Sequence, residues 1–331
     1  MVFVGTEKAE VVRFTLVIRC ALLGAFLCLP ASAVNPDRRI SQYAHSAWRI
    51  LDGSLGGTPR SITQTADGYI MDRAESGIVR FDGVRFIPWT SPGAERLGAS
   101  SVSALLGSSD GSLWIGSVRN GLWHWNNGRL TPYPTPAHVM SINSVQEEGK
   151  ESIWFAVTEP RDQAGSVCEV GEGQFRCYGQ PSGIPPRCCH SLAVDRTGDS
   201  WMGAATTIVK WKPRSSTATI ISLSDAVADP TDVLGFAFPA DDSASIGIDP
   251  PGRMGGLKRF FHGVLSPYTT TGWSSSNIGV ITMLQDRQGT IWIGTSGQGL
   301  YRIRDGAVDH VGAAEGLSAD HVTNIMEDHE G

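Results

Sequence analysis

The sequence predicts an all-β fold, a β-propeller built of four-stranded antiparallel blades. A hairpin unit recurs along the chain. Its clearest copy, residues 286–306 (DRQGTIWIGTSGQGLYRIRDG), alternates short β-branched and aromatic runs with Gly, Asp and Ser turns. Copies follow one another about 40 to 47 residues apart, which is the length of one propeller blade. After the first 33 residues there is no amphipathic segment of helical period, which a doubly wound α/β fold would need for its crossovers.

The first 33 residues have the pattern of a cleaved signal peptide. Lys8, Arg13 and Arg19 precede an apolar run at residues 20–29, and an A-x-A cleavage pattern ends at Ala33. An apolar run of this length spans about 15 Å as a helix, about half of the hydrocarbon core of a bilayer. A cleaved leader is therefore favoured over an uncleaved anchor. Because the run contains no lipoprotein cleavage pattern, we expect an exported, periplasmic chain.

Six copies of the hairpin unit align on the position of Trp292. The aligned positions are Met71, Trp114, Trp154, Trp201, Ser245 and Trp292. Each copy has an apolar segment upstream that supplies the first strand of its blade. Copy one departs from the others at residues 71–74 (MDRA), where the repeat has W-I-G-T.

A seventh first strand is expected at residues 321–331 (HVTNIMEDHEG), where the sequence stops before the next Trp position. Residues 34–60 form an N-terminal segment that contains a further strand-like run, residues 43–51 (YAHSAWRIL). In closed propellers such a strand completes the last blade, so that no sheet edge stays open. We therefore expect a seven-bladed propeller at residues 61–331, with its last blade incomplete in a truncated sequence of poor solubility. An open solenoid and a six-bladed ring are the alternatives.

Composition and charge exclude several classes of protein. Charged residues make up 18% and hydrophobic residues 41%, which argues against a disordered chain and against a multispan membrane protein. The net charge of −6 argues against a nucleic-acid partner, because phosphate binding needs a basic face. The 39 Gly and 10 Trp suit many tight turns with bulky side chains packed between sheets.

The repeat resembles the two-component regulator propeller repeat. The residues that carry the resemblance are Gly289, residues 291–295 (IWIGT), residues 299–302 (GLYR) and residues 315–328 (EGLSADHVTNIMED). Copy one, with residues 81–89 (FDGVRFIPW), is similar to the start of the extracytoplasmic sensor of bacterial hybrid histidine kinases. The resemblance extends over residues 43–331.

This resemblance implies the ligand-sensing propeller of a membrane-bound two-component protein, a sensor histidine kinase. It implies a small-molecule or oligosaccharide ligand, a homodimer at full length, and a membrane helix and output module after residue 331. It implies no cofactor and no enzymatic activity for this part of the chain. A secreted glycan hydrolase or lyase, the sensor of a diguanylate cyclase, and a protein–protein scaffold are the alternatives.

Two motifs are shared with enzymes, but neither predicts a catalytic residue. Residues 107–111 (GSSDG), with Ser109, match a nucleophile elbow, which needs a helix after its turn, whereas a strand is expected here. Asp286, Gly289 and Trp292 have the spacing of an Asp-box turn, in which the Asp side chain accepts backbone N–H groups. A hydrolase would also need convergent carboxylates, and the sequence identifies no such set.

Four cysteines follow the leader: Cys168, Cys177, Cys188 and Cys189. An exported chain meets an oxidising compartment, which favours a disulfide. Cys168 and Cys177 flank a Gly-Glu-Gly sequence symmetrically and could lie opposite one another on a hairpin. A bridge from one of them to Cys188 or Cys189 is the alternative. A zinc site at Cys188, Cys189 and His190 lacks C-x-x-C spacing, so no metal site is predicted.

Polar loop residues on one face are the candidates for ligand binding. In propellers, ligands usually bind on the loops between the second and third strands and on the connections between blades. The candidates in these loops are Arg119, Asn120, Arg161, His190 and Gln298. Such side chains bind sugar hydroxyls or carboxylates by forked hydrogen bonds. We expect Trp123 and Trp125 in the core rather than in a platform for sugars.

Overall fold

The computed structural model of the chain describes residues 38–43, 46, 48, 57–74, 77–98, 101–136, 139, 141–149, 152–157, 166–186, 189–223, 232–252, 255–270 and 272–330. Apart from Glu330, these residues belong to one compact unit, Arg38–His329, whose fold follows. The predicted signal peptide, residues 1–33, lies outside the described residues. No helix in these ranges has the length and apolar character that a membrane span requires.

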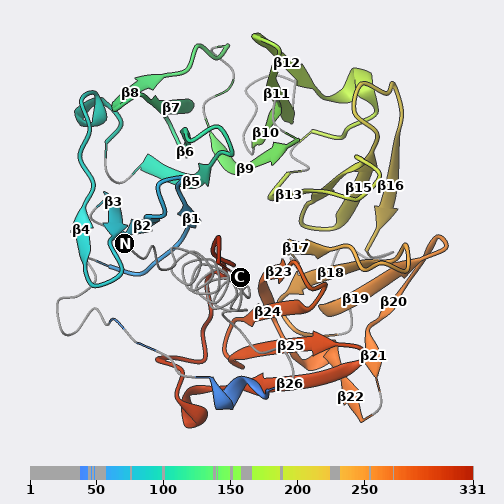
Figure 1. The fold of residues 1–331 in the computed structure, drawn as a ribbon. Coiled ribbons are helices and arrows are strands. Elements are labelled where there is room, and N and C mark those ends of the chain that lie inside the picture. Colours follow the sequence, from blue (N-terminus) through green and yellow to red (C-terminus); the bar gives the residue numbers. More distant parts are fainter. Residues whose placement is uncertain are drawn as a thin grey trace, which may run out of the picture. The chain divides into compact units, whose positions relative to one another are not determined.

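Six four-stranded antiparallel sheets form the unit, and in each sheet the strands are neighbours in sequence order (Figure 1). Blade one has β1 (Ile62–Gln64), β2 (Ile70–Ala74), β3 (Gly77–Phe81) and β4 (Phe86–Pro88), and blade two has β5 (Val102–Gly107), β6 (Leu113–Ser117), β7 (Leu122–Asn126) and β8 (Arg129–Pro132). Blade three has β9 (Ile142–Glu148), β10 (Ser152–Val157), β11 (Val167–Gly171) and β12 (Gln174–Tyr178). Blade four has β13 (Ser191–Val194), β14 (Ser200–Gly203), β15 (Thr207–Trp211) and β16 (Ala218–Ser222). Blade five has β17 (Asp232–Ala237), β18 (Ala244–Asp249), β19 (Gly256–Phe261) and β20 (Val264–Pro267), and blade six has β23 (Val280–Gln285), β24 (Ile291–Thr295), β25 (Leu300–Arg304) and β26 (Ala307–Val311).

Short elements lie in the connections between the blades, before blade one and after blade six. They are the hairpin β21 (Thr269–Thr270) and β22 (Trp273–Ser274), and the single 3-10 turns η1 (Ile40–Gln42), η2 (Ala94–Arg96), η4 (Gln180–Ser182), η5 (Ser275–Asn277) and η6 (Ala313–Glu315). The predicted all-β propeller of four-stranded antiparallel blades is therefore confirmed.

The first strand of each blade is its innermost strand and lies beside the first strand of the next blade. The neighbouring pairs are β1 with β5, β5 with β9, β9 with β13, β13 with β17 and β17 with β23. The Ser103 hydroxyl donates a hydrogen bond to the Ile142 carbonyl, and Ser191 Oγ donates to the Val233 carbonyl at 2.6 Å. Side-chain hydroxyls thus link inner strands that belong to separate sheets.

Tryptophans at the repeated position pack between adjacent blades. Trp114, Trp154 and Trp201 are 6%, 1% and 3% exposed, and each belongs to an apolar cluster with side chains of the following blade. Trp123 is buried between blades one and two, and Trp125 packs against the same cluster. The predicted packing role of these side chains is confirmed.

The turn before β24 has the geometry of an Asp box. Asp286 Oδ1 accepts the N–H groups of Gln288 and Thr290 at 3.1 and 2.8 Å, and Asp286 Oδ2 accepts Trp292 Nε1 at 2.9 Å. Gly289 completes the turn with a φ of 85°, a region that residues with a Cβ rarely adopt. As predicted, the aspartate in this motif holds a turn and orients a tryptophan.

Residues 317–329 follow blade six and contact both blade six and blade one. The Val322 N–H donates to the Thr295 carbonyl of blade six at 3.0 Å. Thr323 Oγ1 donates to the Pro59 carbonyl, just before blade one, also at 3.0 Å. This is the kind of hydroxyl contact that links inner strands elsewhere, so the segment has the position of a seventh inner strand. The described residues form six complete blades, and the seven-bladed ring remains a prediction.

Residues near the N-terminus contact the outer parts of blades six and one. The turn η1 packs on β26, and the Trp48 ring lies against Phe81 of blade one, with 4.6 Å between ring centroids. The strand predicted at residues 43–51 lies mostly outside the described residues, and so it stays a prediction.

Candidate ligand-binding site

The loops of the blades fall on two faces. Because antiparallel strands alternate in direction, the turns between strands one and two and between strands three and four share one face, which we call the turn face. The loops between strands two and three and the connections between blades share the other, the connection face. Loops 118–121 and 296–299 and connections such as 312–320 belong to the connection face.

The candidates in blade two differ in what their side chains do. The Asn120 side-chain amide donates to the Leu97 carbonyl at 2.9 Å, and its backbone N–H donates to Ser117 Oγ at 2.8 Å. Asn120 therefore stabilises its own loop. Arg119 is exposed on the same loop, and Arg161 lies outside the described residues.

His190 lies at the start of blade four, next to a carboxylate of blade five. Its Nδ1 is 2.9 Å from Asp232 Oδ1, and the two side chains are 39% and 52% exposed. Asp232 lies directly opposite Asp249 on the neighbouring strand β18. His190 is among the residues predicted from the sequence, whereas the two aspartates are not, because only the pairing of β17 with β18 brings them together.

Gln298 lines a cavity of about 300 Å³ on the connection face. The cavity is lined by Gly297, Gln298, Tyr301, His310, Gly312, Ala313, Ala314, Glu315 and Asp320. These residues come from the β24–β25 loop, from β25 and β26, and from the connection that contains η6. No hydrogen bond or ion pair joins Gln298 to Arg119, Asn120 or His190, the other described candidates.

The backbone of Gln298 is fixed, whereas its side-chain oxygen has no partner. The Gln298 N–H donates to Thr295 Oγ1 at 2.9 Å, and its carbonyl accepts His310 Nε2 at 2.7 Å. Gln298 Oε1 is buried and accepts no hydrogen bond. The Tyr301 and His310 rings are 4.5 Å apart, and burial raises the pKa of the Tyr301 hydroxyl, so that this group stays neutral.

Two carboxylates converge on Gly312 in the same cavity. Glu315 Oε2 accepts the Gly312 N–H at 2.8 Å, and Asp320 Oδ1 accepts the Ala313 N–H at 2.6 Å. A Cβ atom at Gly312 would lie 2.8 Å from Asp320 Oδ1 and 3.3 Å from Glu315 Oε2. Each carboxylate thus uses one oxygen to hold the backbone and is fixed in place at the cavity wall.

A second cavity, of about 440 Å³, lies on the other side of the same connection. It is lined by Ile40, Ser41, Tyr43, Ser46, Trp48, Trp292, Leu300, Val311, Glu315, Gly316, Leu317 and Ser318. Trp292 is half-buried here, whereas the equivalent tryptophans of blades two to four are covered by a following blade. This cavity therefore lies where the sequence predicts the rest of blade seven.

Asp72 is a buried acid at the position where other blades have isoleucine, such as Ile115 and Ile293. It is 1% exposed, and neither carboxylate oxygen has a hydrogen-bond partner. Burial raises the pKa of Asp72 to about 6. The N–H groups of residues 60, 61 and 73 lower this pKa only in part, and none has hydrogen-bonding geometry to the carboxyl. The departure of residues 71–74 from the repeat thus places an acid in the core of blade one.

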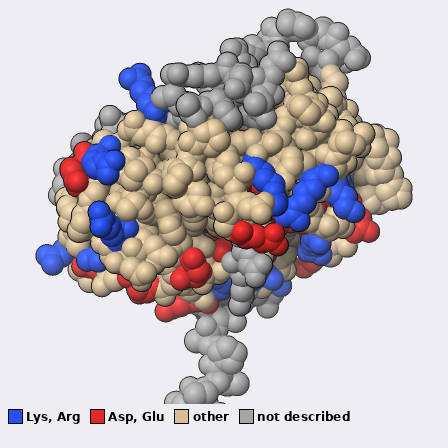
Figure 2. All heavy atoms as spheres, turned by 90° about the horizontal axis from the view of Figure 1, so that it is seen from above, with Lys and Arg blue, Asp and Glu red and all other residues tan. Residues whose placement is uncertain are grey.

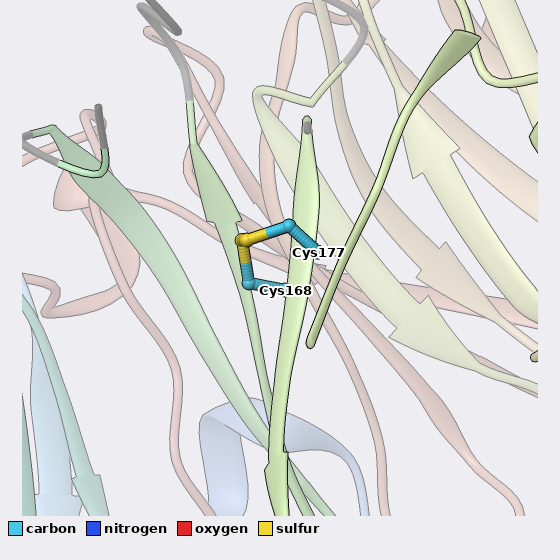
Figure 3. The surroundings of a disulfide bond; sticks show 2 residues. All are labelled: Cys168 and Cys177. Carbon is cyan, nitrogen blue, oxygen red and sulfur yellow. A yellow bond between two sulfur atoms is a disulfide. The ribbon is translucent and has the colours of Figure 1, made fainter. Parts of the chain in front are cut away.

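Cys168 and Cys177 form a disulfide between β11 and β12, where they are directly opposite (Figure 3). Their Cα atoms are 4.1 Å apart. Of the two pairings that the sequence left open, the structure has the hairpin pairing. Cys189 is buried in a cluster with Trp154, and Cys188 lies outside the described residues.

The described residues show no arrangement typical of a catalytic or metal centre at the motifs considered above. Ser109 Oγ donates to Glu147 Oε1 at 2.7 Å, in a turn that leads into β6. No group of three or more His, Cys, Asp or Glu side chains in the described ranges could hold a metal ion. On the face drawn in Figure 2, basic and acidic side chains lie near one another, and most of the surface is formed by uncharged residues.

A family model identifies the repeat. Residues 272–297 match the family described as "Two component regulator propeller". Residues 272–297 therefore carry a two-component regulator propeller repeat. The matched stretch includes the Asp-box turn and Trp292, so the resemblance seen in the sequence is confirmed.

Solved structures share the fold of this chain. The extracellular domain of a protein named as the hybrid two component system BT3049, from B. thetaiotaomicron, has a TM-score of 0.67 at 15% identity, over 86% of this chain and 39% of that chain. The extracellular domain of a protein named as the one component system BT4673, from the same organism, has a TM-score of 0.65 at 15% identity. The match covers 83% of this chain and 37% of that chain. Virginiamycin B lyase from Staphylococcus aureus has a TM-score of 0.57 at 15% identity. The match covers 78% of this chain and 86% of that chain.

At these identities the likeness shows the fold alone. This chain spans 39% and 37% of the first two chains, well under two thirds of their length. No curated protein matches the chain.

Proposed function

We propose that this chain is the extracytoplasmic ligand-sensing propeller of a membrane-bound two-component signalling protein, a sensor histidine kinase. The cavity beside Gln298 carries the proposal. It lies on the face where propellers bind ligands, its polar groups are held in place by the backbone, and one buried acceptor has no partner. The regulator repeat at residues 272–297 and the predicted signal peptide support the same function.

The remaining parts of the proposal follow from the same features. The contacts of residues 317–329 with blades six and one support a seven-bladed ring, in which further strands fill the 440 Å³ cavity. Ligand binding beside the connection 312–320 would shift this segment and the N-terminal residues that pack near it. In a full-length homodimer, such a shift would bias the output module across the membrane.

A secreted lyase or hydrolase is the second candidate. His190 and Asp232 lie on the connection face with the geometry of a base and the group that orients it. The likeness to a lyase fold covers 86% of that enzyme. A hydrolase or lyase would release product from a bound glycan, whereas a sensor would bind the glycan unchanged.

A binding screen paired with a turnover assay tests the proposal. The full chain is screened by thermal shift against a panel of small molecules and of neutral, acidic and amino oligosaccharides, and each hit is then analysed for product by mass spectrometry. We expect at least one ligand that binds without product. Product release that is lost in His190→Ala would favour the enzyme, and no binding across the panel would contradict ligand sensing.

A further inference from the structure

We propose that the cavity beside Gln298 recognises its ligand through a protonated amine, as in an amino sugar. The inference rests on the proposed sensing function and specifies the chemical class of its ligand. It is drawn from the hydrogen-bonding groups, the charge and the aromatic ring that line the cavity.

Hydrogen-bond acceptors predominate among the groups of the cavity wall. Gln298 Oε1 is buried without a donor. His310 Nε2 faces the Gln298 carbonyl oxygen and donates a hydrogen bond to it. Glu315 and Asp320 each accept a backbone N–H with one carboxylate oxygen. The second oxygen of each carboxylate can therefore accept a hydrogen bond from a ligand. An ammonium group supplies three donors and no acceptor, which complements such a wall.

The acidic side chains of the cavity wall have no Lys or Arg beside them in its lining. Glu315 and Asp320 are the carboxylates of the cavity. Two carboxylates crowded beside Gly312 repel an anionic ligand and attract a cation. Asp232 and Asp249 lie on the same face, and they strengthen the negative potential that a cationic ligand would meet.

An aromatic ring and the cavity size narrow the class of ligand. The Tyr301 ring lines the cavity, and a cation over an aromatic face gains about 0.5 to 2 kcal/mol. A volume of about 300 Å³ is at the lower end of small-ligand pockets. A single amino-sugar unit fits such a space, with neighbouring units outside it. The backbone contacts of both carboxylates hold them in place before binding, so little conformational entropy is lost when the ligand arrives.

Binding of two matched probes to the full chain tests the inference. The probes are the β-1,4-linked trimer of glucosamine and the same trimer with every amine acetylated, which differ in charge but not in ring structure. They are compared by isothermal titration at about pH 5.5, where most of the sugar amine is protonated and ordinary carboxylates are still ionised. We expect the glucosamine trimer to bind at least about tenfold more tightly and to lose affinity as salt is raised.

Isosteric variants test whether the two carboxylates of the cavity cause the preference for the glucosamine trimer. Asp320→Asn and Glu315→Gln keep an acceptor for the backbone N–H but remove the charge, and each is expected to weaken the glucosamine trimer about tenfold. Asp305→Asn is the matched control, because its side chain is 93% exposed in the β25–β26 turn on the other face. Its affinity should equal that of the wild type. Unchanged melting temperatures establish that the variants are folded.

Equal or tighter binding of the acetylated trimer would overturn the inference. So would full affinity of the glucosamine trimer in both Asp320→Asn and Glu315→Gln, or binding of neither trimer. The sensing function is decided separately by the wider panel, because a neutral or acidic ligand found there would contradict the amine and leave sensing in place.

Discussion

Arg302 Nη2 lies 3.1 Å from Asp309 Oδ2, and this ion pair fastens the N-terminal residues to blade six. The same carboxylate oxygen accepts the Ile40 N–H at 2.7 Å. Arg302 also donates to the Tyr43 hydroxyl at 3.1 Å and to the Arg38 carbonyl at 2.7 Å. Only 10% of the arginine side chain is exposed. One guanidinium group therefore joins strand β25, strand β26 and the segment that precedes the propeller.

Replacing this arginine should release the N-terminal segment. Arg302→Leu removes the partner of a largely buried carboxylate, and we expect the free energy of unfolding to fall by about 2 to 4 kcal/mol. Urea unfolding measures the loss, and limited proteolysis should show faster cleavage within residues 38–48.

A matched control exists in blade five. Arg259 has the same strand position and pairs with Asp241, but the two side chains are 38% and 52% exposed. Arg259→Leu should cost at most about 1 kcal/mol. Equal losses for the two variants would show that the Arg302 pair has no special role in holding the segment.

Asp72 should make the propeller less stable as pH rises. Its pKa in the folded state is about 6, above the value of about 3.9 for an unfolded chain, so the folded state binds the proton more tightly. The contribution of Asp72 to the free energy of unfolding is therefore most favourable below about pH 4. It becomes less favourable as pH rises through 6, by up to about 3 kcal/mol at neutral pH. Asp72→Asn should be more stable than the wild type at pH 7 and should lack this fall, as measured by urea unfolding across the range. A wild-type profile in the variant would contradict the assignment.

Asp195 should act in the opposite direction at acid pH. Burial opposes its ionisation, but hydrogen bonds from Thr197, Trp201 and the backbone outweigh burial and lower its pKa to about 2. The contribution of its charge is complete above about pH 4 and is lost as pH falls through 2. Asp195→Asn should cost about 2 kcal/mol at pH 7, and the difference from the wild type should shrink in acid. A constant difference between pH 7 and pH 2 would point to packing instead of charge.

The disulfide should stabilise blade three by a moderate amount. Cys168 and Cys177 are 9 residues apart, and closing a loop of this size contributes about 2 to 3 kcal/mol through the unfolded state. The double variant Cys168→Ala with Cys177→Ala should lose this amount in urea unfolding. The wild type under reducing conditions should approach the same stability, and an unchanged stability in both cases would contradict the bridge.

The fold could be predicted from the sequence because each blade repeats local signals. The Asp box of Asp286 and Trp292 is visible within seven letters, and its turn and packing roles follow from turn chemistry. The opposition of Cys168 and Cys177 follows from a symmetric hairpin. The contacts that link the segment after blade six to blade one could not be predicted in the same way. They join residues such as Thr323 and Pro59, which are separated by more than half the chain.

The site was less accessible to sequence reasoning. Gln298 was identified from its loop, but its neighbours Tyr301, His310, Glu315 and Asp320 come from strands and a connection that only the folded blade brings together. A search restricted to loop residues does not find strand residues, such as Tyr301 and His310, that line the same cavity. The acidic residues Glu315 and Asp320 in the connection after β26 were the sequence signal that could have indicated this cavity.

The most direct test of the account is ligand binding to Gly312→Ala. The added Cβ would lie 2.8 Å from Asp320 Oδ1, and so it displaces a carboxylate of the cavity wall, while the φ of −121° at Gly312 suits alanine. For a ligand found in the panel, isothermal titration should show at least about a tenfold loss of affinity, with an unchanged melting temperature and no product from either protein. Wild-type affinity in a folded Gly312→Ala variant would contradict a sensing site at this cavity.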